Sequence, residues 1–100
     1  MPNTLRLPEN DFIQIRVSGR VQNVGFRFFT YQKARKLKLT GYVKNLINGE
    51  VEIIAGGPKV QLDLLIQWLN DGGPNSAHIK EFLVKKVKTD QQYTDFSVRY

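Results

Sequence analysis

Cysteine is absent from this chain of 100 residues, and histidine occurs only once. Without cysteine there can be no disulfide scaffold, no thiolate zinc site and no cysteine nucleophile. A single histidine cannot supply a metal site built from several imidazole ligands. The chain is long enough to bury a modest hydrophobic core without such staples, so we expect one domain stabilised by that core.

Long apolar runs are also missing. No run of about 18 apolar residues occurs, which predicts that no segment spans a membrane. The first segment, MPNTLRLPENDF, lacks the apolar stretch of a secretory signal peptide. We therefore expect a cytoplasmic protein. We also expect a monomer, because the sequence shows no large apolar surface.

Acidic residues are in deficit, with 9 Asp and Glu against 15 Lys and Arg and a formal net charge of +6. A positive balance attracts anionic partners. Nucleic acid, a small phosphorylated substrate and simple solubility all remain open as explanations. The rest of the composition, 41% hydrophobic and 24% charged, is typical of a folded globular protein.

Hydrophobic periodicity predicts the first elements of the fold. Residues 1–11 are interpreted as a flexible N-terminal extension, and residues 12–100 as one domain. An alternation of apolar and polar residues predicts a strand over residues 12–17. A change to helical spacing predicts a helix over residues 26–37. Its apolar residues, Phe28 included, are expected in the core, with one buried face formed by Phe26, Phe29, Ala34 and Leu37.

The second half of the chain repeats this alternation of strands and a helix. Strands are predicted over residues 41–46 and 51–55, joined by a two-residue turn at Asn48 and Gly49 with positive φ at both positions. Pro58 then starts a helix that ends at residues 71–74. Its buried face is expected to consist of Leu62, Leu65, Trp68 and Leu69. Two more strands are predicted, over residues 77–87 and 95–100.

The order β-α-β-β-α-β predicts an α+β fold of the ferredoxin-like type. This α/β sandwich has an antiparallel sheet with two helices on one face. We expect the strands over residues 12–17 and 41–46 to lie side by side. The fold hosts many functions, so it does not identify one.

The segment GRVQNVGFR, residues 19–27, joins the first strand to the first helix. The first turn of a helix has unpaired N–H groups and the positive end of the helix dipole. A loop that adds further N–H groups there forms an anion site, and Arg27 can bind two phosphate oxygens with its guanidinium. The segment matches neither a Walker loop nor a dinucleotide fingerprint. An ordinary strand-to-helix turn remains the alternative.

Three blocks in order resemble the acylphosphatase family. VSGRVQNVGFRFFTYQKA is similar to the family's signature, and GYVKNLINGEVEIIAGG and GPNSAHI match its second and third blocks. The resemblance covers residues 12–100. It implies hydrolysis of the carboxyl–phosphate bond of a small acyl phosphate, which releases a carboxylate and inorganic phosphate.

Site residues follow from the same resemblance. Arg27 matches the phosphate-binding arginine, and Asn45 matches the asparagine that orients the attacking water. Backbone amides of one loop match the phosphate cradle, which here consists of Gly19, Arg20, Val21, Gln22, Asn23 and Val24. The reaction that the resemblance implies requires no metal and no cofactor. We also expect no nucleic-acid partner and no membrane partner.

At two positions, Asn23 and Lys38, this chain has another residue where the family usually has glycine. If the position of Asn23 needs positive φ, asparagine is the best non-glycine residue for that conformation. A strained helix end is expected at Lys38.

Less specific interpretations remain for each residue. Arg27 could be a solvated helix residue, and Asn45 a strand-end residue bonded to its own turn. His78 is expected at the surface. As a whole, the chain could bind an acyl or carbamoyl phosphate without turnover. An RNA-binding domain of this topology needs aromatic residues on its central strands, and the stretch VEIIA offers none.

Overall fold

All the predicted strands and helices occur in the computed structural model, which describes residues 11–89 and 91–100. Of the predicted N-terminal extension, residues 1–10 lie outside the described residues, and Asp11 opens the first strand. The elements follow in the predicted order: β1 (Asp11–Arg20), α1 (Phe26–Lys36), β2 (Thr40–Asn45), β3 (Val51–Gly57), α2 (Lys59–Asn70), β4 (His78–Val87) and β5 (Phe96–Arg99).

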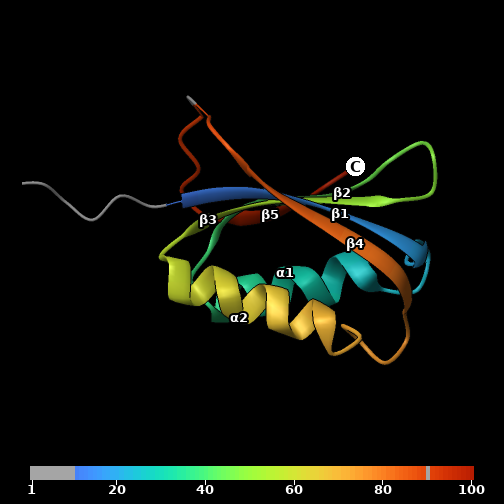
Figure 1. Cartoon of the computed structure of the whole chain (residues 1–100). Coiled ribbons are helices and arrows are strands. Elements are labelled where there is room, and N and C mark those ends of the chain that lie inside the picture. Colours follow the sequence, from blue (N-terminus) through green and yellow to red (C-terminus); the bar gives the residue numbers. More distant parts are fainter. Residues whose placement is uncertain (1–10, 90) are drawn as a thin grey trace, which may run out of the picture.

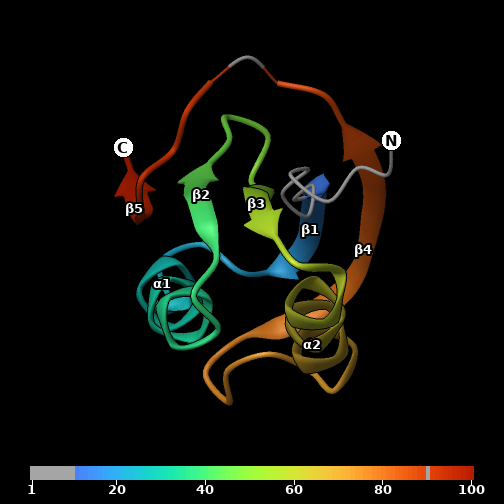
Figure 2. The same cartoon turned by 90° about the vertical axis from the view of Figure 1, so that its left-hand side faces the viewer.

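The strands form one sheet in the order β4-β1-β3-β2-β5. Strand β1 pairs antiparallel with β3 and β4, and β2 pairs antiparallel with β3. Both helices cover the same face of this sheet (Figure 1), which confirms the predicted ferredoxin-like sandwich. The sheet is mixed rather than purely antiparallel, because β5 lies at the far edge from β4 and runs parallel to β2 (Figure 2).

The expectation that the first strand lies beside residues 41–46 is wrong, because β3 lies between β1 and β2. Strand β2 pairs with one edge of β3 through the hairpin, so β1 pairs with the other edge of β3. The register nevertheless places the end of β2 level with the last part of β1. Asn45 pairs with Val51, and Val51 pairs with Val17 near the end of β1.

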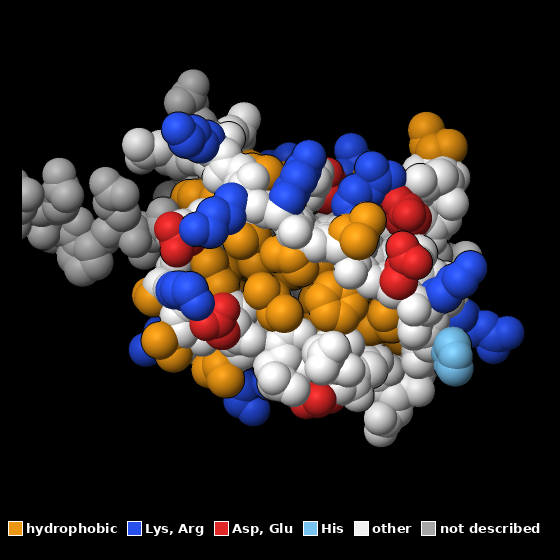
Figure 3. Space-filling view, in the orientation of Figure 1, with side chains coloured by type: hydrophobic (Ala, Val, Ile, Leu, Met, Phe, Trp, Pro, Cys, Tyr) orange, Lys and Arg blue, Asp and Glu red, His pale blue; other side chains and the backbone are white. Residues whose placement is uncertain are grey.

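Alternate residues of β1 and β3 face the helices and form the core. Ile15, Val17, Val51 and Ile53 are fully buried, as the period-two pattern predicts. Leu62, Leu65 and Leu69 of α2 are buried against this face. Apolar side chains also show at the surface along the seam between β4 and α2 (Figure 3), where Ile66 and Val84 line a shallow hollow.

The buried face of α1 differs from the prediction. Phe26, Thr30 and Ala34 are buried, whereas Phe28 and Phe29 are 54% and 40% exposed. The buried residues of α1 follow the i, i+4 row, so Phe28 lies off this face and Phe29, three residues after Phe26, lies at its border. The prediction of a core position is therefore wrong for both of these phenylalanines.

The β2–β3 turn also differs from the expected form. Gly49 has φ 92, but Asn48 does not have positive φ. Leu46 N donates to Glu50 O at 2.8 Å, and Gly49 N donates to Leu46 O at 3.2 Å. These bonds close a loop longer than two residues with one glycine at positive φ. Such loops are the most common hairpin connections after two-residue turns. Neither helix of the described residues is long and apolar enough to cross a membrane.

Candidate active site

The connection from β1 to α1 leaves the start of the helix open. Gly25 is the N-cap of α1 with φ 81, and no side chain among the described residues caps this helix start. The first turn of α1 also contains no acidic residue. The first N–H groups of α1, together with the positive end of its dipole, are therefore available to an anion.

The path of this loop depends on its glycine at the end of β1. Gly19 has φ 121, and a Cβ there would lie 2.6 Å from the backbone nitrogen of Lys80 in β4. The pairing of β1 with β4 shifts register between Ser18 and Gly19. Pairing with β4 continues after this irregularity to Arg20, and the loop to α1 begins there.

Asn23 has φ 63, so this position does need positive φ. Asparagine tolerates this left-handed conformation better than most other residues with a side chain. Lys38, after α1, has φ 60 and lies in the position expected for a C-terminal glycine. Both departures from the family pattern thus keep the backbone that glycine would adopt.

Gln22 fastens the loop to the β2–β3 hairpin. Its Nε2 donates to the carbonyl oxygens of Leu46 and Glu50, both at 2.8 Å. The Glu50 carboxylate at this turn has a lowered pKa, because it accepts hydrogen bonds from Asn48 and Arg16. From the sequence, only the backbone amide of Gln22 was expected at the site. Its side-chain bonds could not be predicted, because they join residues far apart in sequence.

Ser76 holds the loop from the opposite side. Its hydroxyl donates to the carbonyl oxygen of Val24 at 2.6 Å. Ser76 belongs to the third of the three sequence blocks, in the connection between α2 and β4. The third block therefore contacts the loop of the first block, as the second block does through Leu46 and Glu50, although no site residue was predicted in it.

Arg27 is the second residue of α1 and is half-buried. Its Nη1 donates to Arg99 O at 3.1 Å, and its guanidinium lies 4.6 Å from the centre of the Tyr100 ring. These contacts with the end of β5 orient the side chain, so Arg27 is not simply solvated. A guanidinium has five N–H donors, and most of them remain for a ligand.

Asn45 is the last residue of β2. Its Oδ1 is buried and accepts no hydrogen bond from the described residues. A buried polar atom without a partner costs about 1–3 kcal/mol, so such atoms are rare outside functional sites. Asn45 therefore differs from a strand-end residue that bonds its own turn.

Arg27 and Asn45 line one cavity of about 200 Å³ at the N-terminal end of α1. The β2–β3 hairpin and the loop before α1 lie at this same end of the molecule (Figure 1). Two residues of the predicted loop, Val21 and Asn23, also line the cavity. The complete lining is Val21, Asn23, Gly25, Phe26, Arg27, Phe28, Asn45, Val98 and Tyr100.

The other predicted loop residues do not line this cavity. Gly19 contacts β4, the Gln22 side chain binds the hairpin, and Val24 accepts the bond from Ser76. Arg20 is exposed at the end of β1. His78 is exposed as expected and appears at the edge of the molecule in Figure 3.

Comparison with known proteins identifies the family. The acylphosphatase family model matches residues 13–98. An acylphosphatase from Coxiella burnetii is 38% identical with a TM-score of 0.82, and the match covers 91% of this chain and 94% of that one. The acylphosphatase from Bacillus subtilis is 37% identical with a TM-score of 0.82, with 90% and 99% of the two chains covered.

A longer protein contains a similar fold. Full-length HypF, in a phosphate- and nucleotide-bound form, is 32% identical with a TM-score of 0.86, and 95% of this chain matches 12% of that one. The matches to the two single acylphosphatases, by contrast, extend over most of both chains. Sequence, fold and these matches together show that the chain belongs to the acylphosphatase family, the enzymes that hydrolyse acyl phosphates.

Proposed function

We propose that this chain hydrolyses acyl phosphates without a metal ion, at the cavity lined by Arg27 and Asn45. Arg27 and backbone amides of the 19–24 loop hold the phosphate, and Asn45 orients the attacking water. One observation carries the proposal: both side chains line the same small cavity at the uncapped start of α1, although they come from different elements.

The phosphate group is held by complementary charge. The first N–H groups of α1 supply donors and a positive potential, and Arg27 adds a planar pair of donors. The bond from Arg27 to Arg99 O keeps the guanidinium in place before the substrate arrives. Preorganised donors stabilise the charge that develops on the phosphoryl oxygens in the transition state.

The reaction itself needs little help from a strong base. Water oxygen forms the new bond to phosphorus, and the bond from phosphorus to the carboxyl oxygen breaks. The carboxylate leaves with the electron pair, and a phosphate oxygen of the substrate takes the proton of the water. The transition state is loose, so positioning and charge stabilisation supply most of the catalysis.

Asn45 is suited to position that water. An amide can meet a water molecule with either end, as acceptor or as donor. Its oxygen accepts no hydrogen bond from the described residues, so a water has no competing donor to displace. Asn45 in this role orients the water and removes no proton from it.

Hydrolysis of acetyl phosphate in excess EDTA tests the proposal, with Arg27→Ala and Asn45→Ala beside the wild type. Loss of one donor to a transition-state charge typically lowers the rate by about 10²–10³-fold, which we expect for Arg27→Ala. Loss of the contact that positions the water should lower the rate by about 10²-fold in Asn45→Ala. Arg35→Ala and Asn70→Ala are matched controls, since both residues are exposed and neither lines the cavity. Both controls should stay within about twofold of the wild type.

A second outcome separates the enzyme from a binding module. Saturable binding of phosphate by a folded wild type that hydrolyses neither acetyl nor benzoyl phosphate would contradict the proposal. The Asn23 side chain at the cavity would then be the first suspect. The variant Asn23→Gly, which restores the family residue, would test it directly.

A further inference from the structure

A groove between the two helices forms a second hollow, apart from the proposed active site. It has a volume of about 830 Å³, and in the described part of the chain it shares no lining residue with the cavity at Arg27. Sites for small organic molecules typically have volumes of about 300–1,000 Å³, with mostly apolar walls and a few polar groups that converge. The size of this groove therefore suits a small organic molecule.

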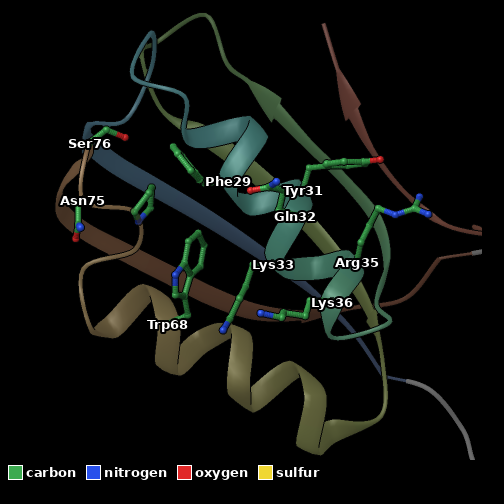
Figure 4. A pocket seen from close by; sticks show the side chains of 10 residues that line it. Phe29, Tyr31, Gln32, Lys33, Arg35, Lys36, Trp68, Asn75 and Ser76 are labelled. Atoms are coloured by element: carbon green, nitrogen blue, oxygen red, sulfur yellow. The ribbon is translucent and has the colours of Figure 1, made fainter.

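Aromatic side chains from both helices form the apolar walls of the groove. Phe29 projects from α1 and Trp68 from α2 (Figure 4). Phe29 is 40% exposed and Trp68 is half-buried, although both were predicted in the core. Trp68 packs against Phe26 with 6.4 Å between ring centres, and a Cβ at Gly25 would lie 3.3 Å from the Phe29 ring. These contacts hold both rings in place and leave part of each ring accessible to a flat apolar ligand.

Lysine side chains supply the charge of the groove. Lys33 and Lys36 point into it beside Trp68 (Figure 4). Within the described residues, the lining contains no acidic side chain and neither lysine forms a salt bridge. Arg35 instead lies over the Tyr31 ring at 5.5 Å and points away from α2. Two ammonium groups beside an aromatic wall are complementary to an anionic group on an apolar body.

We propose that the groove binds a small organic anion with a flat aromatic body. The aromatic body contacts Phe29 and Trp68, and its anionic group lies beside the two lysines. A bare inorganic anion would form only exposed ion pairs, which contribute little to affinity. A neutral aromatic ring would leave both lysines without a partner, so only a ligand that joins the two features uses the whole groove. This second site does not depend on hydrolysis at the cavity.

The test uses anilinonaphthalene sulfonate, an aromatic anion whose fluorescence increases on apolar protein surfaces. A fluorescence titration gives its dissociation constant. Trp68 is the only tryptophan of the chain, so the indole N–H region of a nitrogen–proton NMR spectrum contains a single signal that reports on the groove. We expect saturable binding that shifts this signal. Saturating inorganic phosphate should leave the affinity for the dye within about twofold, because phosphate binds at a separate site.

Paired variants identify the groups that hold the dye. Lys33→Gln with Lys36→Gln should weaken binding roughly three- to tenfold, because two exposed charge contacts are lost. Phe29→Ala should weaken it roughly two- to tenfold through the loss of one aromatic contact. Lys85→Gln with Lys86→Gln is the matched control, because it removes the same charge at the shallow hollow between β4 and α2. This control should keep the affinity within about twofold.

Phenylnaphthylamine, a dye with the same rings and no sulfonate, tests the charge separately. Its affinity should be equal, within about twofold, in the wild type and in the variant that lacks both groove lysines. An equal loss for both dyes would mean that the lysines only support the shape of the groove, and would overturn their part in the site. The lysine variants remain decisive even where Phe29→Ala fails to fold.

Other outcomes would overturn the site as a whole. An unmoved Trp68 indole signal, or an unchanged affinity without Lys33 and Lys36, would show that the dye binds elsewhere. Equal weakening in the control that lacks Lys85 and Lys86 would contradict the proposal in the same way. Displacement of the dye by inorganic phosphate would place it in the cavity at Arg27. A wild type that hydrolyses no acyl phosphate defeats the proposed function alone, so the two failures are distinguishable.

Discussion

The two ends of α1 treat charge in opposite ways. Its last turn contains Lys33, Arg35 and Lys36, which stabilise the negative end of the helix dipole. Its first turn has no acidic residue and no side-chain cap, and Arg27 lies there against the positive end of the dipole. The charges at the C-terminal end therefore stabilise the helix, whereas those at the N-terminal end oppose its dipole.

The hollows beside these two ends differ in the same way. A groove of about 830 Å³ lies between α1 and α2, and Trp68, Lys33 and Lys36 point into it (Figure 4). This groove is larger than the cavity at Arg27. Its cations, however, lie in the last turn of α1, where their charge already interacts favourably with the negative end of the helix dipole. The smaller cavity combines an uncapped helix start with an unpartnered amide oxygen.

The largest effect on the rate that this comparison predicts is that of Arg27→Lys. Lysine keeps the charge but loses the planar pair of donors, so we expect kcat/KM for acetyl phosphate to fall about 10²-fold. The same exchange at the other end of the helix, Arg35→Lys, should leave the rate within about twofold. Similar rates for both variants in a steady-state assay would contradict the assignment of the site.

Gln22→Ala should have the next largest effect. It removes two hydrogen bonds to the hairpin and leaves two carbonyl oxygens to water, which costs about 1–2 kcal/mol of unfolding free energy. Because the loop then loses its attachment beside Asn45, we expect roughly a tenfold lower kcat. Urea unfolding and initial rates measure the two effects. Gln32→Ala in the larger groove is the control, and an equal loss there would refute a specific role for Gln22.

Lys36→Glu tests the stabilising end of α1. An acidic residue in the last turn opposes the dipole, and we expect unfolding free energy to fall by about 0.5–1 kcal/mol with kcat/KM unchanged. Thermal unfolding at low and high salt measures the change, which should shrink at high salt. A tenfold loss of activity in the folded variant would mean that the larger groove takes part in the reaction.

The last prediction is confined to alkaline pH and concerns Tyr42 in β2. Burial and a hydrogen bond to Glu52 raise the pKa of Tyr42 to about 12. The folded state therefore holds this proton more tightly than the unfolded state, so stability falls as pH rises from about 10 to 12. In this range the free energy of unfolding should fall less steeply with pH for Tyr42→Phe than for the wild type. An unchanged slope would show that Tyr42 contributes nothing to alkaline unfolding.

Local patterns were sufficient to predict much of the fold. Alternation in β1 and β3, the helix-breaking residues after α2 and the glycine-flanked loop all depend on neighbours in sequence. Asparagine at position 23 was compatible with positive φ, a conformation that few residue types adopt. Arg27 and Asn45 were assigned from the resemblance to a family and not from any single spacing.

Long-range contacts were not predictable from those patterns. The position of β3 between β1 and β2 depends on pairing across the sheet, and the bonds from Gln22 and Ser76 join segments far apart in sequence. The prediction of which face of α1 is buried was partly wrong. Thr30, a polar residue, is fully buried, whereas Phe29 is exposed. Hydrophobic periodicity alone gives such a threonine no weight.

Phosphate affinity tests the division of labour between the two side chains most directly. Isothermal titration calorimetry with inorganic phosphate would compare wild type, Arg27→Ala and Asn45→Ala. Loss of a charge-assisted hydrogen bond weakens binding by roughly 10- to 100-fold, and we expect this for Arg27→Ala. Asn45→Ala should bind phosphate within about threefold of wild type although its turnover is lost. Equal weakening in both variants, or none in Arg27→Ala, would contradict the account.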